Sequence, residues 1–315
     1  MLIIDRQAFR DAATYFDLAA AGGFVELSRS SRTLLACTRG GRPRKVIRFS
    51  HFGSGNLTVT HQVNVISRVQ GAGFTNVQKF ARGVTGYEFY IDHLGLTASV
   101  YDYIAGSARQ PVPTPEWPIV TTVLNQLTET MGSVTAEGLP VGDIRIRFEA
   151  DLQVAQRLLR KWPLPYTSAL PIFRLLLAEI EPLAGCHIIH GDLNAGNLIR
   201  RKSRVAVIDF ESAAIGCVLA ELAPIMTSLP FDGSTLNWLR IDSLLRQFSR
   251  KILEHATPDQ FSRILPLTAI AFFGRSNATV GAPKQLEIRD FLRALELVRY
   301  EKRIASVLHE ASRVL

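Results

Sequence analysis

Cysteine is scarce in this sequence, and its few copies are widely spaced. The 315 residues include 3 cysteines, Cys37, Cys186 and Cys217, and no two of them fall within four residues of each other. An odd number of isolated cysteines forms neither a disulfide framework nor the paired spacing of a zinc site. We therefore interpret them as small core residues and expect a reducing compartment.

Long apolar runs are also missing. No stretch approaches the roughly 20 apolar residues that a membrane span requires. Near the N-terminus, Asp5, Arg6, Arg10 and Asp11 interrupt the chain before the apolar core of a signal peptide can form. We therefore expect a cytoplasmic protein with no membrane partner. Internal repeats and low-complexity tracts are absent too, which excludes repeat architectures.

The net charge of +8 at pH 7 raises the question of nucleic-acid binding. The basic residues are mostly arginines, are scattered along the chain and are not interleaved with aromatic residues. The densest cluster, at 200–204, falls in an expected turn between two strands. A solvated surface explains this pattern better than a nucleic-acid interface, which stays a minor alternative.

The expected elements change in type along the chain. Helical spacing of apolar residues occurs at 5–21 and 59–70. Strand-like runs lie at 24–27, 33–38, 45–49, 77–82 and 98–104. A proline-rich polar run at 107–116 is typical of a linker. Beyond it the patterns are mainly helical, apart from one strand pair around 198–208.

The most informative stretch follows an apolar strand end. It reads HGDLNAGN from His190 to Asn197, and one hairpin later Asp209 leaves a second apolar strand. Phosphoryl transfer needs positioning and charge neutralisation more than covalent help from the protein. Asp192 is placed to accept or orient an acceptor hydroxyl, and Asn197 and Asp209 offer the oxygen ligands that Mg²⁺ prefers. His190 would hold the loop as a scaffold.

A simpler explanation exists for each of these residues alone. Aspartate and asparagine at 192, 194 and 197 also cap turns, which is their commonest use. The joint pattern, with two strands flanking it in the required order, favours the catalytic interpretation.

These residues resemble the catalytic and metal-binding loops of protein kinases, which read H-R-D-x-x-x-x-N and D-F-G. They are more similar to the aminoglycoside phosphotransferase and choline kinase-like family, with H-G-D-x-x-x-x-N and I-D-[FW]-E; here IDFE stands at 208–211. The resemblance implies an α+β, bilobal protein-kinase-like fold with a small antiparallel sheet lobe and a larger, mainly helical lobe. It also implies a kinase that uses ATP and Mg²⁺ to phosphorylate a hydroxyl of a small molecule.

The resemblance suggests where the lobes meet. We expect a nucleotide-binding lobe at 1–100, a hinge at 101–106, and a lobe at 107–315 with the catalytic loop, metal loop and acceptor site. The likeness spans roughly residues 24–230 and is specific at 187–211.

Phosphate contacts are expected from the N-terminal lobe. The polar turn at 28–32 lies where the family places its phosphate loop, so Ser30 and Ser31 would donate hydrogen bonds; a plain hairpin turn is the alternative. Arg48 stands at the lysine position of the kinase V-A-I-K motif, and a guanidinium binds phosphate oxygens in a bidentate manner. Lys45 should point to the opposite face of the strand.

The hinge and the following helix complete this lobe. Tyr101, Tyr103 and Ile104 would offer backbone groups to adenine. Gln62 falls at the position where the family normally has a glutamate that pairs with the strand cation. Either the partner of Arg48 lies elsewhere, or this cation is held more loosely than usual.

The family segment that follows the metal aspartate usually ends in D-L-A, and Glu221 takes the aspartate position here. It would brace the base; a solvated helix carboxylate is the alternative.

The acceptor is expected to be a small hydroxylated molecule such as an antibiotic, sugar, amino acid or amino alcohol. Over 236–315 basic residues outnumber acidic ones, which favours a neutral or anionic acceptor over a polycationic one, unless these arginines are merely solvated. They include Arg240, Arg246, Arg250, Arg263, Arg275, Arg289, Arg293 and Arg299.

Two functions stay open, and the oligomeric state is not predicted. The intact Asp192, Asn197 and Asp209 favour an active kinase. Gln62 and the glycine-free turn favour a catalytically silent, kinase-like binding protein.

Overall fold

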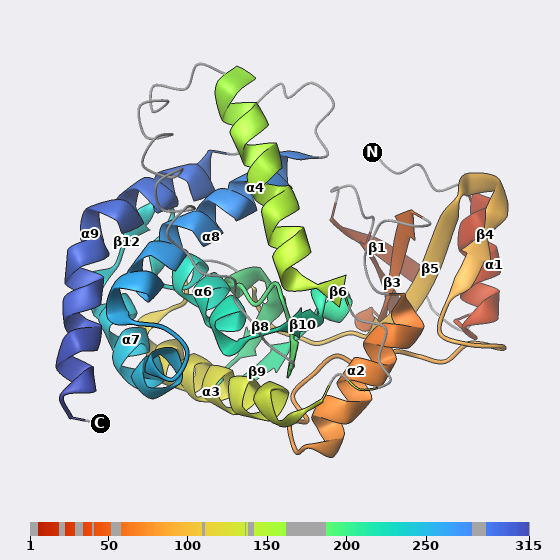
Figure 1. The fold of residues 1–315 in the computed structure, drawn as a ribbon. Helices are drawn as coiled ribbons and strands as arrows, with labels where there is room; N and C mark the ends of the chain where they lie inside the picture. Colours follow the sequence, from red (N-terminus) through yellow and green to blue (C-terminus); the bar gives the residue numbers. More distant parts are fainter. Residues whose placement is uncertain are drawn as a thin grey trace. The chain divides into compact units, whose positions relative to one another are not determined.

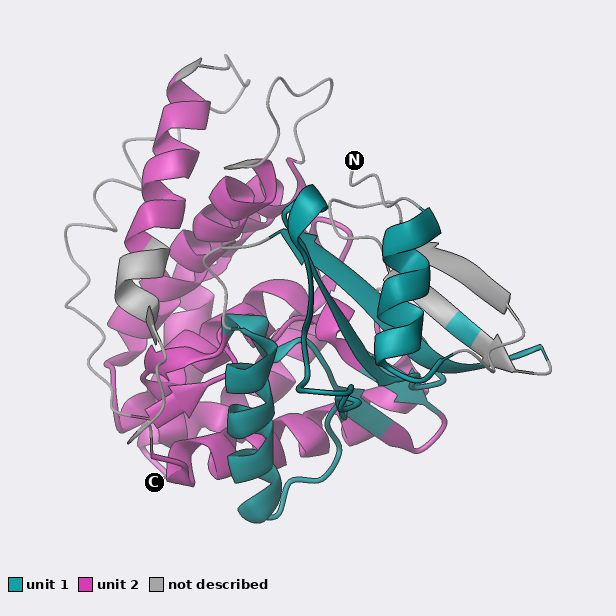
Figure 2. Cartoon of the chain, turned by 90° about the vertical axis from the view of Figure 1, so that its right-hand side faces the viewer, with its two compact units in different colours: residues 1–107, 199–201, 205–212 teal, residues 108–198, 202–204, 213–315 magenta. Residues whose placement is uncertain are grey.

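The computed structural model describes most of the chain, and Figure 1 labels many of its helices and strands. The described residues are 6–18, 23–28, 34–39, 41–51, 58–108, 111–135, 137, 142–161, 187–278 and 288–314. The chain divides into two compact units, which Figure 2 colours separately. Unit 1 comprises residues 1–107, 199–201 and 205–212, and unit 2 comprises residues 108–198, 202–204 and 213–315.

Unit 1 is built on a five-stranded sheet in which neighbouring strands are antiparallel and the order is β1-β2-β3-β5-β4. Its strands are β1 (Gly23–Ser28), β2 (Leu34–Arg39), β3 (Arg42–His51), β4 (Phe89–Ile91) and β5 (Leu96–Asp102). Between β2 and β3, Gly41 has a φ of +75°, which glycine adopts without steric cost. The central position of β3 places Arg48 between two paired strands.

Two helices accompany the sheet. Helix α1 (Arg6–Tyr15) contributes Ala8 and Ala12 to a buried apolar cluster with sheet residues such as Ile47 and Phe49. Helix α2 (Val59–Gly71) begins at Thr58, whose hydroxyl accepts a hydrogen bond from the His61 backbone N–H at 3.4 Å. The buried side of α2 consists of Val59, Gln62, Val65, Ile66 and Val69.

The strand expected at 77–82 is not formed as a continuous strand. Val77 forms a bridge with Val207, whereas Phe80 forms a bridge with Tyr101. The segment forms isolated bridges and changes partner along its length. Because a continuous strand needs one partner over several residues, the expectation is wrong in this respect.

A hairpin formed by β8 (Leu198–Arg201) and β9 (Arg204–Val207) also belongs largely to unit 1. Ser107 and Arg200 exchange backbone hydrogen bonds of 2.8 and 2.9 Å. A Cβ at Gly106 would lie 2.6 Å from the Arg200 carbonyl oxygen, so only glycine permits this approach. These contacts group the hairpin with unit 1, although we expected it in the second lobe.

Unit 2 is mainly helical. Its long helices are α3 (Trp117–Ser133), α4 (Ile144–Lys161), α6 (Val218–Ser228), α7 (Trp238–Leu253), α8 (Pro258–Ala278) and α9 (Arg289–Ser312). Helix α8 packs against α4, α6 and α9. Helix α7 illustrates why these segments fold as they do: its apolar residues recur at helical spacing and are buried, namely Ile241, Leu244, Leu245, Phe248 and Ile252.

Short strands complete unit 2. A three-stranded sheet has β10 (Ala214–Gly216) between β6 (Gly142–Asp143), which is parallel to it, and β7 (His187–Ile189), which is antiparallel. Strands β11 (Phe231–Asp232) and β12 (Thr235–Leu236) form a hairpin. An antiparallel sheet unit and a larger helical unit confirm the α+β fold class. Among the described helices, none combines the length and the apolar character needed to cross a membrane.

Candidate active site

The HGDLNAGN loop begins where β7 ends inside unit 2. Ile188 and Ile189 are buried, and the His190 side chain is completely buried. Gly191 has a φ of +72°, a left-handed conformation that suits glycine. The chain turns here and leaves the Asp192 carboxylate partly exposed, whereas a buried imidazole such as that of His190 cannot meet a substrate.

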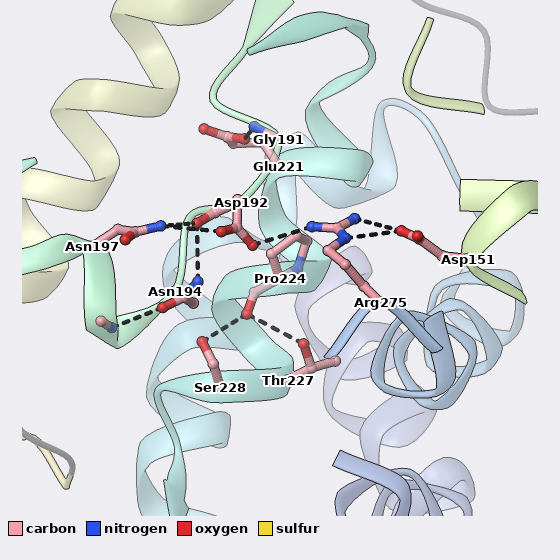
Figure 3. Close-up of polar contacts among 11 residues, drawn as sticks. Asp151, Gly191, Asp192, Asn194, Asn197, Glu221, Pro224, Thr227, Ser228 and Arg275 are labelled. Carbon is pink, nitrogen blue, oxygen red and sulfur yellow. Dashed lines mark hydrogen bonds and ion pairs between the residues drawn. The ribbon is translucent and has the colours of Figure 1, made fainter. Parts of the chain in front are cut away.

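The Glu221 side chain of α6 binds the backbone of this loop. Its two carboxylate oxygens accept the backbone N–H groups of His190 at 3.2 Å and Gly191 at 3.0 Å. Figure 3 shows Glu221 beside Gly191. The side chain is buried, and desolvation raises the pKa of Glu221, partly offset by the nearby His190 and by the two amide hydrogen bonds. The alternative of a solvated helix carboxylate is therefore wrong: Glu221 braces the loop one residue before Asp192.

Asp192 is fixed by the two asparagines that follow it. The Asn197 side-chain amide donates to the Asp192 carbonyl oxygen at 2.8 Å and to the Asp192 Oδ2 at 3.2 Å (Figure 3). Asn194 donates to the same carbonyl and accepts the Gly196 N–H at 2.8 Å. The capping role foreseen for such residues thus applies to Asn194, whereas Asn197 reaches the Asp192 carboxylate itself.

Arg275 of α8 also contacts Asp192, and neither its role nor that of its partner was identified from the sequence. The Arg275 Nη1 lies 3.3 Å from the Asp192 Oδ1, and its Nε and Nη2 donate to the Asp151 Oδ2 at 2.9 and 2.8 Å. Figure 3 shows this bridge between three elements. Asp151 lies in a helical sequence with no motif, so no local signal could have found it.

In unit 1, Arg48 of β3 binds two carboxylates of the IDFE segment. Its Nη1 lies 2.9 Å from the Asp209 Oδ1, and its Nη2 lies 2.9 Å from the Glu211 Oε2. None of the three side chains is more than 26% exposed, which strengthens such pairs relative to surface pairs. Lys45 instead forms an ion pair with Asp102 at 2.5 Å, so the two cations serve different partners.

This arrangement answers the question raised by Gln62. Gln62 is buried on α2 and carries no charge, as the sequence indicated. The carboxylates that hold Arg48 come from the loop after β9. Glu211 was visible in the sequence as part of IDFE, but its contact with Arg48 joins residues too far apart for spacing to reveal.

Asp209 itself has an unusual backbone. Its φ is +69°, which is sparsely populated by residues other than glycine, though asparagine and aspartate tolerate it best. The Asp209 backbone N–H donates to the Gln78 Oε1 at 2.8 Å, and Gln78 is buried. Backbone strain of this kind is common at functional sites. Gln78 is a supporting residue that carried no recognisable sequence signal.

The expected hinge residues lie at and after the end of β5. Tyr101 lies near Arg48 and Asp209, and desolvation is the main cause that raises its pKa to about 12. The backbone N–H of Tyr103 already donates to the Arg44 carbonyl at 2.9 Å. The Tyr103 backbone donor is therefore already paired within unit 1, and the hinge role of the three residues stays a prediction. Ser30 and Ser31 lie outside the described residues.

The described residues contain no group of three or more His, Cys, Asp or Glu side chains that could hold a metal ion by themselves. Asn197 in unit 2 and Asp209 in unit 1 each present oxygen atoms, the donor type that Mg²⁺ requires. Mg²⁺ is usually bound by one or two protein groups together with substrate phosphates. Their chemistry fits that kind of ion.

Most arginines of the C-terminal segment are paired with a carboxylate. Each of the eight predicted as candidates forms an ion pair with a carboxylate. Several pairs lie along one helix, such as Arg246 with Asp242 and Arg250 with Glu254. The count of basic residues therefore overstates the positive charge offered to an acceptor.

Residues 27–249 match the sequence model of the phosphotransferase enzyme family. This match covers well over half of the chain and includes the HGDLNAGN loop, the IDFE segment and Glu221. No curated protein sequence matches the chain.

Solved structures share the fold at low sequence identity. Amicoumacin kinase hAmiN, in complex with AMP-PNP, Ca²⁺ and Ami, is 13% identical with a TM-score of 0.63, covering 96% of this chain and 94% of that one. The streptomycin–ATP–APH(2″)-IIa ternary complex is 12% identical with a TM-score of 0.58, covering 93% and 99%. Choline kinase LicA from Streptococcus pneumoniae is 12% identical with a TM-score of 0.58, covering 94% and 98%.

Proposed function

This chain belongs to the phosphotransferase enzyme family, and from that premise we propose that it is an ATP- and Mg²⁺-dependent kinase of a small molecule. The acceptor group would be a hydroxyl. The observation that carries the proposal is the fixed Asp192 carboxylate, held by Asn197 in a loop that matches the family motif.

Asp192 would act as the base. Its side chain is partly exposed. Asn197 orients the carboxylate, and Glu221 holds the loop backbone at the preceding residue. An acceptor hydroxyl would donate its hydrogen bond to Asp192, which orients the hydroxyl oxygen and takes its proton as the phosphoryl group is transferred. His190 would serve as a scaffold because its side chain is buried.

Asn197 and Asp209 would hold the metal through their side-chain oxygens. When bound, Mg²⁺ supplies positive charge that neutralises the phosphate oxygens. Asp209 is restrained by Gln78 and Arg48, so its carboxylate direction is set by unit 1 before any ligand binds.

Arg48 and the hinge would bind the nucleotide. The Arg48 guanidinium has the planar donor geometry that suits phosphate oxygens. The complexes of the structural relatives with AMP-PNP and ATP support ATP as the donor. Ser30, Ser31, Tyr101, Tyr103 and Ile104 complete the proposed nucleotide contacts.

The acceptor class follows from the same relatives only in broad terms. Their complexes contain antibiotics, and others are choline kinases, so a hydroxylated antibiotic, sugar, amino acid or amino alcohol is proposed. The cytoplasmic location expected from the sequence stays a prediction.

The alternative of a catalytically silent binding protein loses part of its support. It drew on Gln62, which suggested that Arg48 lacks a charged partner. Arg48 is in fact held by Asp209 and Glu211, so a carboxylate on α2 is not needed to position it.

Calorimetric titration with ATP, with and without Mg²⁺, tests the proposal. We expect ATP binding that strengthens at least tenfold when Mg²⁺ is present. If no nucleotide binds at any Mg²⁺ concentration, the kinase proposal fails.

A further inference from the structure

Arg275 differs from the other arginines of the helical unit because it reaches the catalytic loop. Arg246, Arg250 and Arg299 pair with carboxylates three or four residues away on their own helices. Arg275 instead joins α8 to the Asp192 loop and to Asp151 on α4. It also lies beyond residue 249, where the family model stops matching.

The Arg275 contact completes the restraint on the Asp192 carboxylate. Asn197 donates to Oδ2 at 3.2 Å, and Arg275 donates to Oδ1 at 3.3 Å. The terminal torsion of an aspartate side chain is broad, so a carboxylate held at one oxygen can still rotate. Donors at both oxygens restrict that rotation. In phosphoryl transfer, where positioning outweighs basicity, such a restraint is useful.

Arg275 is itself held in place. Two of its nitrogens, Nε and Nη2, bind the Asp151 Oδ2, and the Asp151 side chain is only 14% exposed. The Phe272 ring lies under the guanidinium, with the Arg275 Cζ 5.2 Å from the ring centroid. A guanidinium held by two partners loses little further freedom when it binds a third.

The helices are packed unusually closely at this point. A Cβ at Gly274 would lie 2.0 Å from the Asp151 carbonyl oxygen and 3.0 Å from the Ala155 nitrogen. Glycine at 274 therefore lets α8 approach α4 directly beside Arg275. The bridge is thus supported by backbone packing as well as by charge.

We propose that Arg275 is a positioning residue for Asp192 and that Asp151 acts through it. This inference rests on the proposed function, in which Asp192 is the base. Arg275 would fix the orientation of the carboxylate toward the acceptor hydroxyl without taking part in nucleotide binding.

The proposal predicts a specific change in kinetics. Arg275→Gln should lower kcat about tenfold or more and leave the KM for MgATP within about twofold, since Arg275 acts on the base and not on the nucleotide. Arg275→Lys should lose less activity than Arg275→Gln, because lysine keeps the positive charge but lacks the planar guanidinium that can bind two partners at once. The assay measures the slow hydrolysis of MgATP, in which water takes the place of the acceptor.

Asp151 and a neighbouring arginine provide the controls. Asp151→Asn should lower kcat, and combining it with Arg275→Gln should give no further loss, because both act through the same contact. Arg263→Gln removes another arginine of α8, one that pairs with Glu301 at 3.3 Å, and should leave kcat unchanged. If Arg275→Gln keeps kcat within twofold of the wild type, the positioning role is wrong.

A stability measurement separates this inference from the proposed function. Urea denaturation of Arg275→Gln, Asp192→Asn and the double variant tests the contact without any turnover. We expect the double variant to be less destabilised than the sum of the single variants. Additive destabilisation would show that Arg275 and Asp192 do not interact and would overturn the inference. If the wild type binds no MgATP, the kinase proposal fails, and the stability of the single and double variants still tests the contact between Arg275 and Asp192.

Discussion

At the scale of single residues, Asp192 and Asp209 are held by different partners, and we expect their substitution to have different effects on activity. Asp192 is restrained by Asn197 and Arg275, and Asp209 by Gln78 and Arg48. Each set lies within one unit of the chain. One aspartate would serve the acceptor and the other the metal, so substitutions at the two positions can be told apart.

Asp192→Asn should abolish turnover while MgATP still binds. A positioned general base contributes ~10²–10⁴-fold, and asparagine cannot take a proton. We expect kcat to fall by that range in a coupled assay of ADP release, with the MgATP dissociation constant within about threefold of the wild type. Asp242→Asn, which removes a carboxylate paired with Arg246 on α7, is the matched control and should be silent. Turnover of Asp192→Asn within about threefold of the wild type would refute the assignment.

Asp209→Asn should weaken nucleotide binding itself. Asparagine tolerates the left-handed backbone at this position, so the substitution removes charge with little added strain. We expect at least tenfold weaker binding of MgATP by calorimetry, and little change for ATP measured in excess EDTA, because the carboxylate acts through the metal. Equal loss in both conditions would assign Asp209 a purely structural role.

The choice between the two cations of β3 can be tested directly. Arg48→Gln removes the guanidinium that binds Asp209 and Glu211, and should weaken MgATP binding about tenfold or more. Lys45→Gln removes a cation of the same strand that pairs with the half-exposed Asp102, and should change the binding less than twofold. Calorimetry of both variants compares them under one protocol, and a larger effect at Lys45 would reverse the assignment.

The residues that could be read from the sequence are those whose spacing is local. Asp192 and Asn197 stand five residues apart, and Asp209 follows a strand, so their pattern is visible without a structure. Gln78 and Asp151 contact the site from segments far away along the chain. Such contacts depend on how distant segments pack, so local sequence patterns cannot predict them.

At the scale of elements, the close contact of α8 with α4 has a measurable cost if it is disturbed. Gly274→Ala places a methyl group against the Asp151 carbonyl, and overpacking of this kind costs ~1–3 kcal/mol. We expect that loss in the free energy of unfolding from urea titration. Gly132→Ala in α3 adds a methyl group with no neighbour within 4 Å, so it should be neutral or stabilising by ~0.5–1 kcal/mol. Equal effects at both positions would contradict the packing.

The buried Glu221 side chain of α6 predicts that the stability of the protein depends on pH. Burial raises the pKa of Glu221 above its ordinary value of 4.5, so ionising it in the folded protein costs free energy. The stability that Glu221 contributes is therefore full below about pH 4.5 and is lost as the pH rises through the raised pKa. We expect the stability of the wild type relative to Glu221→Gln to fall as the pH rises from 4.5 to 8, measured by urea denaturation. A difference that grows with pH would contradict this sign.

Strands and helices were not equally predictable. The helical spacing of α2 reflects one buried face, so the helix expected at 59–70 agrees with Val59–Gly71. The segment at 77–82 was expected to form a strand, yet its partner changes from Val207 to Tyr101. Strand β4 has only three residues, too few for alternation to be recognised. Strand pairing depends on the partner segment, which the local sequence does not specify.

At the scale of the whole molecule, the order of a small sheet unit and a larger helical unit was readable from the sequence, and the family match agrees with it. The charge of the C-terminal segment predicted the acceptor less well. The excess of arginine over 236–315 suggested the character of the acceptor, but eight of those arginines are paired with carboxylates. A net charge sums residues without their partners, so it says little about what a site offers to a substrate.

The central claim is that this chain transfers phosphate from ATP to a small hydroxylated molecule. The most direct test incubates the protein with MgATP and a panel of hydroxylated antibiotics, sugars, amino acids and amino alcohols, and detects products by mass spectrometry. We expect one class of acceptor to gain the mass of a phosphoryl group only when Mg²⁺ is present, and not with Asp192→Asn. Phosphorylated product formed equally by the wild type and Asp192→Asn, or MgATP binding without transfer to any acceptor or to water, would contradict the account.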